Sequence, residues 1–183
     1  MIRLSKSIAA RMRQATRRIL RAEDGNATIE FVIIVPLFLT IFMSAFECGL
    51  LMTRNVMLER AMDISIRDLR LGATPTHDQL KQKICTLAAI IPNCMSTVLL
   101  ELRPVSTTTW QPLGTTVTCV DRTQVIQPIT QFLPGVKNQM MLVRACAVFD
   151  PIFPLTGLGL KLPKDASGGY QLIASSAFVN EPK

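Results

Sequence analysis

The sequence predicts an α+β fold in which a long N-terminal helix precedes a small domain, with one or two helices packed on an antiparallel sheet. Three observations predict it. Sixteen residues at 31–46 carry no charge, an apolar stripe at helical spacing follows them, and three later segments are rich in β-forming residues. We therefore expect a basic leader at 1–25, a transmembrane and stalk helix at 26–72 and the α+β domain at 73–183.

The leader carries most of the net charge of the 183-residue chain. Residues 1–24 hold seven Lys or Arg and two acids, which gives +5 of the total of +7. Apolar residues recur there at helical spacing, which predicts a short basic amphipathic helix. A basic tail is also typical of nucleic-acid binding, but this one abuts an apolar run and has no interleaved aromatic residues. The pattern favours the anionic inner surface of a membrane and argues against nucleic acid.

The apolar run is long enough to span a membrane. A hydrocarbon core about 30 Å thick needs roughly 20 helical residues. The segment from Phe31 to Thr53 supplies 23 positions, interrupted only by Glu47. We expect one span at about 31–53, in which Pro36 is tolerated. A cleaved signal sequence and a buried core helix are the alternatives, and the first lacks a convincing A-x-A-like cleavage site.

Charge and cysteine usage predict the compartment of the domain. Seven basic residues precede the span and four arginines follow it. The positive-inside rule therefore predicts a single-pass inner-membrane protein with a cytoplasmic N-terminus and a periplasmic C-terminal domain. Cys85, Cys94, Cys119 and Cys146 form an even set, as expected for two disulfides in an oxidising compartment. Three pairings are open. Sequence proximity favours Cys85 with Cys94 and Cys119 with Cys146, and four buried thiols are the alternative.

Two helices are predicted outside the membrane. The long helix continues along an apolar stripe and stops at Gly72. The stripe consists of Leu58, Met62, Ile66 and Leu69. A capping box at 76–79 then starts a second helix, whose apolar face reaches Ile91.

Strand-forming segments follow the second helix. We expect strands near 98–103, 141–149 and 170–179, and weaker strands near 110–120. Residues 150–169 contain several prolines and glycines, which predict a long surface loop.

No pattern in the sequence indicates an enzyme. His77 is the only histidine, which excludes a site built on paired histidines. No Cys-x-x-Cys pair, glycine-rich phosphate loop or Gly-x-Ser-x-Gly elbow occurs, and the carboxylates of the domain are scattered. We expect no catalytic residue, metal, cofactor or small-molecule substrate.

Two acids border the apolar run. Glu30 lies at its start, where a carboxylate either reaches back to the interface or costs several kcal/mol and needs a partner charge. Glu47 is 17 residues further along, about 25 Å on a helix axis, and so lies near the opposite interface. The two acids cannot serve one site.

The segment around Glu30 carries a recognisable motif. Gly25 is followed by four residues beginning with Asn26, and then by Glu30 and Phe31. This arrangement is similar to the prepilin-peptidase motif of type IV pilins and pseudopilins.

The continuation of the helix makes the resemblance more specific. With Pro36 and the Glu-x-Gly pattern at Glu47 and Gly49, the chain resembles the TadE-like minor pseudopilins of the tight-adherence (Tad/Flp, type IV-related) pilus over residues 23–72. One difference is that Phe31 stands where this subclass commonly has tyrosine.

The resemblance implies a non-enzymatic, membrane-anchored protein that takes part in assembly of a tight-adherence pilus and hence in cell adhesion. It implies cleavage by a prepilin peptidase between Gly25 and Asn26, after which Glu30 offers its carboxylate to the amino terminus of a neighbouring subunit. The implied partners are the inner membrane, the peptidase, other pilins or pseudopilins and the assembly machinery. The alternative is an uncleaved single-pass membrane-anchored periplasmic binding module. A periplasmic hydrolase on a stalk would need a pocket of convergent polar groups, which the sequence does not indicate.

Overall fold

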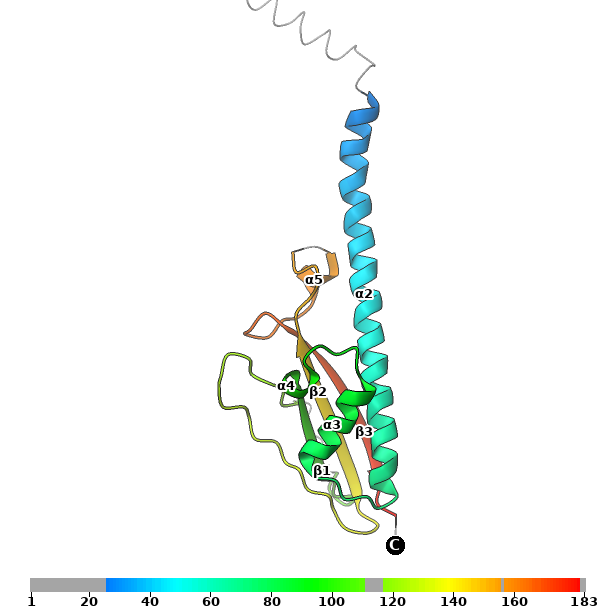
Figure 1. Cartoon of the computed structure of the whole chain (residues 1–183), viewed down its shortest axis with the longest axis vertical. Coiled ribbons are helices and arrows are strands. Elements are labelled where there is room, and N and C mark those ends of the chain that lie inside the picture. The colour runs from blue at the N-terminus through cyan, green and yellow to red at the C-terminus, as the bar shows by residue number, and fades with distance from the viewer. Residues whose placement is uncertain (1–25, 111–116, 156, 182–183) are drawn as a thin grey trace, which may run out of the picture. The chain divides into compact units, whose positions relative to one another are not determined.

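The computed structural model describes residues 26–110, 117–155 and 157–181 (Figure 1). It has the α+β fold that the sequence predicts, a long helix followed by a small domain with helices on a three-stranded antiparallel sheet. The elements in chain order are α2 (Asn26–Arg70), α3 (His77–Leu87), α4 (Cys94–Thr97), β1 (Val98–Pro104), β2 (Met140–Phe149), α5 (Gly157–Lys161) and β3 (Tyr170–Val179). The leader, with its expected amphipathic helix and Gly25, lies outside the described residues.

The chain divides into two compact units, residues 1–42 and residues 43–183, and α2 contributes to both. The described part of the first unit is the apolar N-terminal portion of α2, which includes Pro36. Apolar side chains are exposed around this portion, and α2 is long and apolar enough to cross a membrane. The predicted helix at 26–72 is thus confirmed, with its end two residues earlier.

The core of the second unit lies between one face of the sheet and the helices α2 and α3. The strand order is β1-β2-β3, and both pairs are antiparallel. Alternate strand residues face the helices, as the period of a strand requires. They include Val98, Leu100 and Leu102 of β1, Met141, Val143 and Ala145 of β2, and Ala174 and Phe178 of β3. Leu58, Met62, Leu80 and Ile84 are buried in the same cluster from the helix side, which confirms both predicted helical stripes.

The structure confirms the two predicted helix boundaries, the end of α2 at Gly72 and the start of α3 at the capping box. Gly72 has a φ of 92°, a left-handed conformation that glycine adopts without a side-chain clash, and its amide donates to the Leu69 carbonyl at 2.9 Å. At the start of α3, the Gln79 amide donates to the Thr76 hydroxyl, and the Thr76 amide donates to the Gln79 side chain at 2.9 Å. This reciprocal pair is the capping box that the sequence predicts.

The connection from β1 to β2 differs from the expectation of weak strands near 110–120. Trp110 and residues 117–120 are not in strands, and 111–116 lie outside the described residues. The physical reason is that Cys119 is bonded to Cys146 in the middle of β2, whose two edges are already paired with β1 and β3. The segment that pairs instead is further along, where the Leu102 amide donates to the Gln131 carbonyl at 2.9 Å.

The connection from β2 to β3 is also more ordered than the predicted surface loop at 150–169. It contains α5, and both Pro151 and Gly159 are buried. The prediction of an irregular surface loop was wrong for α5 and for the buried residues. Prolines and glycines indicate turns, but they do not reveal that the segment packs against α2, which is distant in the sequence.

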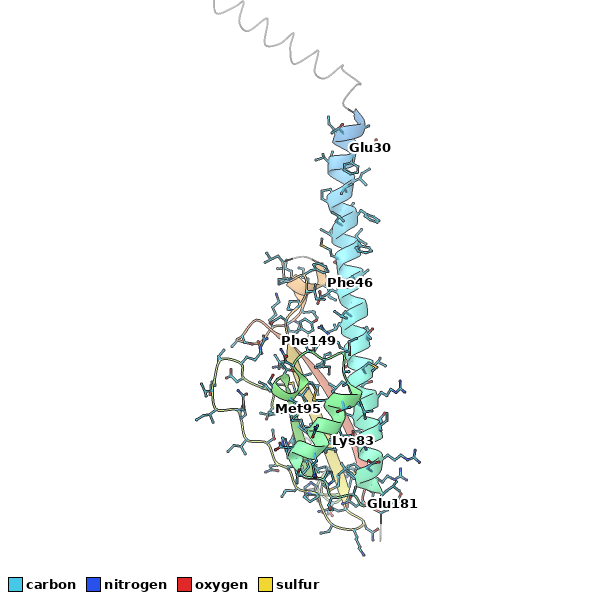
Figure 2. All side chains as sticks on the ribbon, in the orientation of Figure 1. Glu30, Phe46, Lys83, Met95, Phe149 and Glu181 are labelled. Atoms are coloured by element: carbon cyan, nitrogen blue, oxygen red, sulfur yellow. A yellow bond between two sulfur atoms is a disulfide. The ribbon has the colours of Figure 1, made fainter. Side chains whose placement is uncertain are left out.

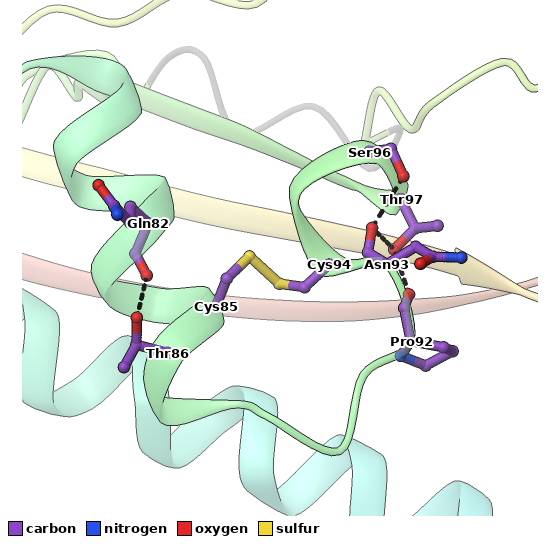
Figure 3. The surroundings of a disulfide bond; sticks show 8 residues. All are labelled: Gln82, Cys85, Thr86, Pro92, Asn93, Cys94, Ser96 and Thr97. Carbon is purple, nitrogen blue, oxygen red and sulfur yellow. Dashed lines mark hydrogen bonds between the residues drawn. A yellow bond between two sulfur atoms is a disulfide. The ribbon is translucent and has the colours of Figure 1, made fainter.

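Both disulfides favoured by sequence proximity are present. Cys85 near the end of α3 is bonded to Cys94 at the start of α4, nine residues away in sequence (Figure 3). Cys119 is bonded to Cys146, 27 residues away. Around the first bond, the Ser96 and Thr97 hydroxyls donate to the Asn93 carbonyl. The two bonds fix α4 to α3 and the long connection to β2.

Removing the longer-range disulfide is expected to destabilise the domain more than removing the shorter one. Replacing Cys119 and Cys146 with alanine should lower the free energy of unfolding by roughly 3 to 4 kcal/mol, and replacing Cys85 and Cys94 by roughly 2 to 3 kcal/mol, because a longer loop gains more entropy in the unfolded chain. Urea denaturation of the full chain in detergent measures both values. Replacement of Cys48, a free and exposed cysteine, by serine is the control, and a reversed order would contradict the prediction.

Candidate functional site

The most distinctive side chain in the second unit is Glu47, which is charged by type but only 1% exposed. Its carboxylate accepts three donors. The amide of Ile152 donates to Oε2 at 3.0 Å, the amide of Phe153 donates to the same oxygen at 3.1 Å, and the hydroxyl of Tyr170 donates to Oε1 at 3.0 Å. Hydrogen bonds to an ionised acceptor are about twice as strong as neutral ones. Glu47 therefore links α2 to two other segments of the unit.

Helical spacing places Glu47 on the same face of α2 as the predicted stripe. Leu51, Arg54 and Leu58 follow it at intervals of four, three and four residues, which lie on one side of a helix. The buried face of α2 therefore begins about three turns before Leu58, the first apolar residue that the sequence analysis assigned to it. Two of its members are charged residues, which is why an apolar pattern alone did not reveal them.

Arg54 is the second charged residue buried on this face, at 9% exposed. Its guanidinium carbon lies 4.6 Å from the centre of the Phe149 ring, a cation–π geometry. The Phe149 ring in turn meets the Tyr170 ring edge-on, with centroids 4.6 Å apart. Among the described residues, the Nε and Nη1 atoms of Arg54 have no hydrogen-bond partner. The contact with the aromatic face therefore contributes to the stabilisation of this buried cation.

Tyr170 lies between the two buried charges, and its hydroxyl proton is held in place. Burial, followed by the hydrogen bond to Glu47 and the charge of that residue, raises the pKa of Tyr170 to about 12, although Arg54 acts in the opposite direction. The phenol therefore remains a neutral donor over the physiological pH range. This is the protonation state that the bond to the Glu47 carboxylate requires.

The segment between β2 and β3 also packs tightly against α2. Gly157 has a φ of 48°, and a Cβ at this position would overlap the Ser44 side chain and lie 2.9 Å from its Cβ. Phe46 meets Phe153 edge-on, with ring centroids 6.2 Å apart. Figure 2 labels Phe46 and Phe149 on the side of α2 where α5 and β2 lie. We call this set the Glu47 junction: Ser44, Phe46, Glu47, Arg54, Phe149, Ile152, Phe153, Gly157 and Tyr170.

The chemistry of the Glu47 junction is that of a structural connection. The carboxylate is occupied by three donors, and the phenol proton is held by that carboxylate. Among the described residues, no cluster of three or more His, Cys, Asp or Glu side chains is arranged to hold a metal ion. What the junction does is fix the connection after β2 and the start of β3 to the middle of α2.

The structure places the other sequence-predicted residues along α2. Glu30 and Phe31 are exposed on the apolar portion, Asn26 is the first residue of the helix, and Gly49 is exposed with open space around the position of a Cβ. Glu47, which the sequence analysis assigned to the span, lies in the second unit, while Glu30 lies in the first. The junction residues Arg54, Phe149 and Tyr170 were not anticipated. The only available signal was the spacing of two charged residues on the face of a predicted stripe.

The fold and the junction define a class of protein. Within the described residues, one apolar helix is long enough to anchor the protein in a membrane, and it continues into a disulfide-bonded α+β domain. Comparison with protein families makes the class more specific. Residues 25–67 match the family described as TadE-like protein, which confirms the resemblance seen in the sequence and relates the chain to membrane proteins of the tight-adherence pilus. The match covers α2 from its start to within three residues of its end. No match was found among curated proteins, and none among solved structures.

Removing the Glu47 carboxylate is expected to loosen the connection after β2. Glu47→Ala should lower the free energy of unfolding by roughly 3 kcal/mol, because it leaves two partly buried amides and a buried phenol without their acceptor. It should also increase the hydrogen-exchange rates of the Ile152 and Phe153 amides. Glu59→Ala, at an exposed acceptor on the same helix, is the matched control and should leave these rates unchanged. Unchanged amide protection in Glu47→Ala would contradict the assigned contacts.

Ionisation of Tyr170 is expected to destabilise the domain at alkaline pH. Because its pKa is higher in the folded state than its usual value of 10, its contribution to stability is complete below pH 10 and is lost as pH rises towards and through about 12. Denaturation curves between pH 8 and 12 measure this effect. Tyr170→Phe should be less stable at neutral pH but lose stability less steeply above pH 10. Equal slopes for the two proteins would show that Tyr170 does not titrate as described.

Proposed function

We propose that this chain is a membrane-anchored, pseudopilin-like protein that takes part in the assembly of a tight-adherence pilus and is processed by a prepilin peptidase after Gly25. The observation that carries the proposal is the position of Glu30. It is an acid on the exposed apolar portion of α2, five residues after Gly25 and inside the family match. In an uncleaved anchor, the same carboxylate would only reach back to the membrane interface.

The surroundings of Glu30 support a role in pairing. Ile29, Phe31 and Ile33 are all exposed beside it, so this part of α2 is adapted to an apolar medium (Figure 2). A carboxylate in such a medium is costly unless an opposite charge meets it. Cleavage after Gly25 would create a positively charged amino group at Asn26, and the same group on a neighbouring subunit is the partner that we propose for Glu30. The attraction would also define the register between subunits.

Charge and cysteines support the orientation that we propose. The leader contributes +5 before α2, and the two disulfides lie in the domain after it. Basic residues remain on the cytoplasmic side, while disulfides form in the periplasm. The protein is therefore proposed to cross the inner membrane once, with its domain in the periplasm. There it would contact other pilins or pseudopilins and the assembly machinery, with no enzymatic activity of its own.

The proposal predicts the mature N-terminus and the effect of changing Glu30. In native membranes the mass should correspond to a chain beginning at Asn26, and it should depend on the peptidase. Glu30→Gln should leave cleavage intact but abolish pilus assembly, because the amide keeps the shape of the side chain and loses its charge. Intact mass and N-terminal sequencing measure cleavage, and electron microscopy of cells measures pili.

Two controls separate the parts of this prediction. Gly25→Val should block cleavage, because a branched side chain obstructs the peptidase. Glu59→Gln changes an exposed acid elsewhere on α2 and should affect neither cleavage nor assembly. A chain that starts at Met1 with and without the peptidase would support an uncleaved membrane-anchored binding module instead. Normal pili in Glu30→Gln would remove the role given to that residue.

A further inference from the structure

The connection from β2 to β3 packs on the last residues of the uncharged run of α2. A Cβ at Gly157 would overlap the Ser44 side chain, and the Phe153 ring meets the Phe46 ring edge-on. Ser44 and Phe46 both belong to the uncharged run at 31–46. The Glu47 junction, which begins at the end of this run, holds the connection in place through two backbone amides. A membrane crossed by the uncharged run therefore has its surface at the level of this connection.

The same connection exposes large apolar side chains. Ile152, Leu155 and Leu160 are 47%, 82% and 60% exposed. In Figure 1, α5, which carries the last of the three, lies at the end of the second unit opposite the C-terminus of α2. Exposed apolar groups that are gathered on one segment mark a contact with another protein or with a membrane.

The charges of the connection distinguish between these two occupants. Residues 151–164 contain two lysines and no acid. Lys161 and Lys164 are both exposed, and the Lys164 ammonium donates to the Pro154 carbonyl at 3.3 Å, next in the chain to the exposed Leu155. Leucines combined with lysines are typical of segments that lie at the boundary between the headgroups and the acyl chains of an anionic membrane. The composition therefore favours lipid.

The acids on either side of the connection are already bound within the domain. Asp150 accepts two hydrogen bonds from the Arg122 guanidinium, at 2.7 and 2.9 Å. Asp165 accepts from the amides of Ser167 and Gly169, both at 2.9 Å. The negative charge at the borders is thus offset by groups of the chain itself, and the two lysines determine the charge of the segment between them.

We propose that residues 151–155 and 157–164, which we call the membrane-contact segment, lie in the surface of the membrane that α2 crosses. The apolar side chains enter the upper part of the acyl chains, and the two lysines meet the phosphate groups of anionic lipids. Continuity with the uncharged run and a positive charge without acids are the two observations that identify lipid as the occupant. A protein partner would not require the segment to be packed on the run itself.

The contact moves the expected end of the span. Irregular backbone is not tolerated where hydrocarbon surrounds it. The hydrocarbon core therefore ends near Phe46, about two turns before Thr53, and the buried charges of Glu47 and Arg54 lie outside it. Roughly 20 residues counted back from Phe46 reach Ala27, which places Glu30 inside the core, where a partner charge is needed most.

This inference rests on the proposed crossing of the membrane by α2. It does not rest on cleavage after Gly25, on the pairing of Glu30 or on pilus assembly. The experiment therefore measures the crossing and the surface contact separately.

The test places a single tryptophan in the full chain and measures its contact with lipid. Trp110 is the only tryptophan, so Trp110→Phe provides a background without tryptophan fluorescence. In this background, Leu155→Trp reports on the membrane-contact segment and Phe38→Trp on the uncharged run, while Val125→Trp, at an exposed apolar position in another connection, is the matched control. Each chain is reconstituted in phosphatidylcholine vesicles, with or without an equal part of phosphatidylglycerol, and quenching by phosphatidylcholine brominated on its acyl chains is measured. Thermal unfolding and a count of free thiols show that each variant is folded.

The expected result is quenching at two of the three positions. Phe38→Trp should be quenched most, Leu155→Trp roughly half as much, because a segment in the interface reaches only the upper acyl chains, and Val125→Trp not at all. Phosphatidylglycerol should increase the quenching of Leu155→Trp. Adding Lys161→Gln and Lys164→Gln should remove this increase, whereas Lys137→Gln, at an exposed lysine outside the segment, should not.

The possible failures are distinguishable. Quenching of Phe38→Trp without quenching of Leu155→Trp would overturn the surface contact, leave the crossing intact and indicate a protein as the occupant. Equal quenching of Leu155→Trp and Val125→Trp would also overturn it, because the contact would not be specific to this segment. An absence of quenching at Phe38→Trp would overturn the proposed crossing and this inference together. An effect of phosphatidylglycerol that persists without the two lysines would overturn the role given to them.

Discussion

The packing of the second unit depends on the hydrogen bonds that the Glu47 carboxylate accepts from three donors. It joins α2 to the amides of Ile152 and Phe153 and to the hydroxyl of Tyr170. Burying a carboxylate is unfavourable, and only a full set of donors with good geometry compensates for it. The arrangement is therefore specific: the connection after β2 must approach this turn of α2, and β3 must begin beside it. Arg54, stacked on Phe149, extends the same junction along the helix.

The order of the elements explains why one edge of the sheet is covered and the other is not. The connection from β1 to β2 is long, and the disulfide between Cys119 and Cys146 together with the bonds around Leu102 hold it beside β1. Just after β3, the Glu181 amide donates to the Arg70 carbonyl at the end of α2. No comparable segment of the described chain is left to cover β3.

Much of the fold could be predicted from the sequence because its signals are local. The start of α3 is encoded by Thr76 and Gln79, the end of α2 by Gly72, and each strand by alternation within one segment. The junction could not be predicted in this way, because Glu47 and Tyr170 are 123 residues apart and meet only when the sheet has packed on α2. A buried acid with distant partners looks the same in sequence as an acid near a membrane surface. Similarly, nothing local distinguishes Cys119, bonded to the face of β2, from a residue in a weak strand.

Tyr170 is the only tyrosine in the chain. Every tyrosine signal in the ultraviolet spectrum, including the absorbance change on ionisation, therefore comes from a single place, the contact between the start of β3 and the Glu47 carboxylate. The protein thus contains its own optical probe at the junction, and no label is needed to follow it. Any ligand, mutation or neighbouring subunit that disturbs the packing of the domain on α2 would be detectable in solution from this one ring.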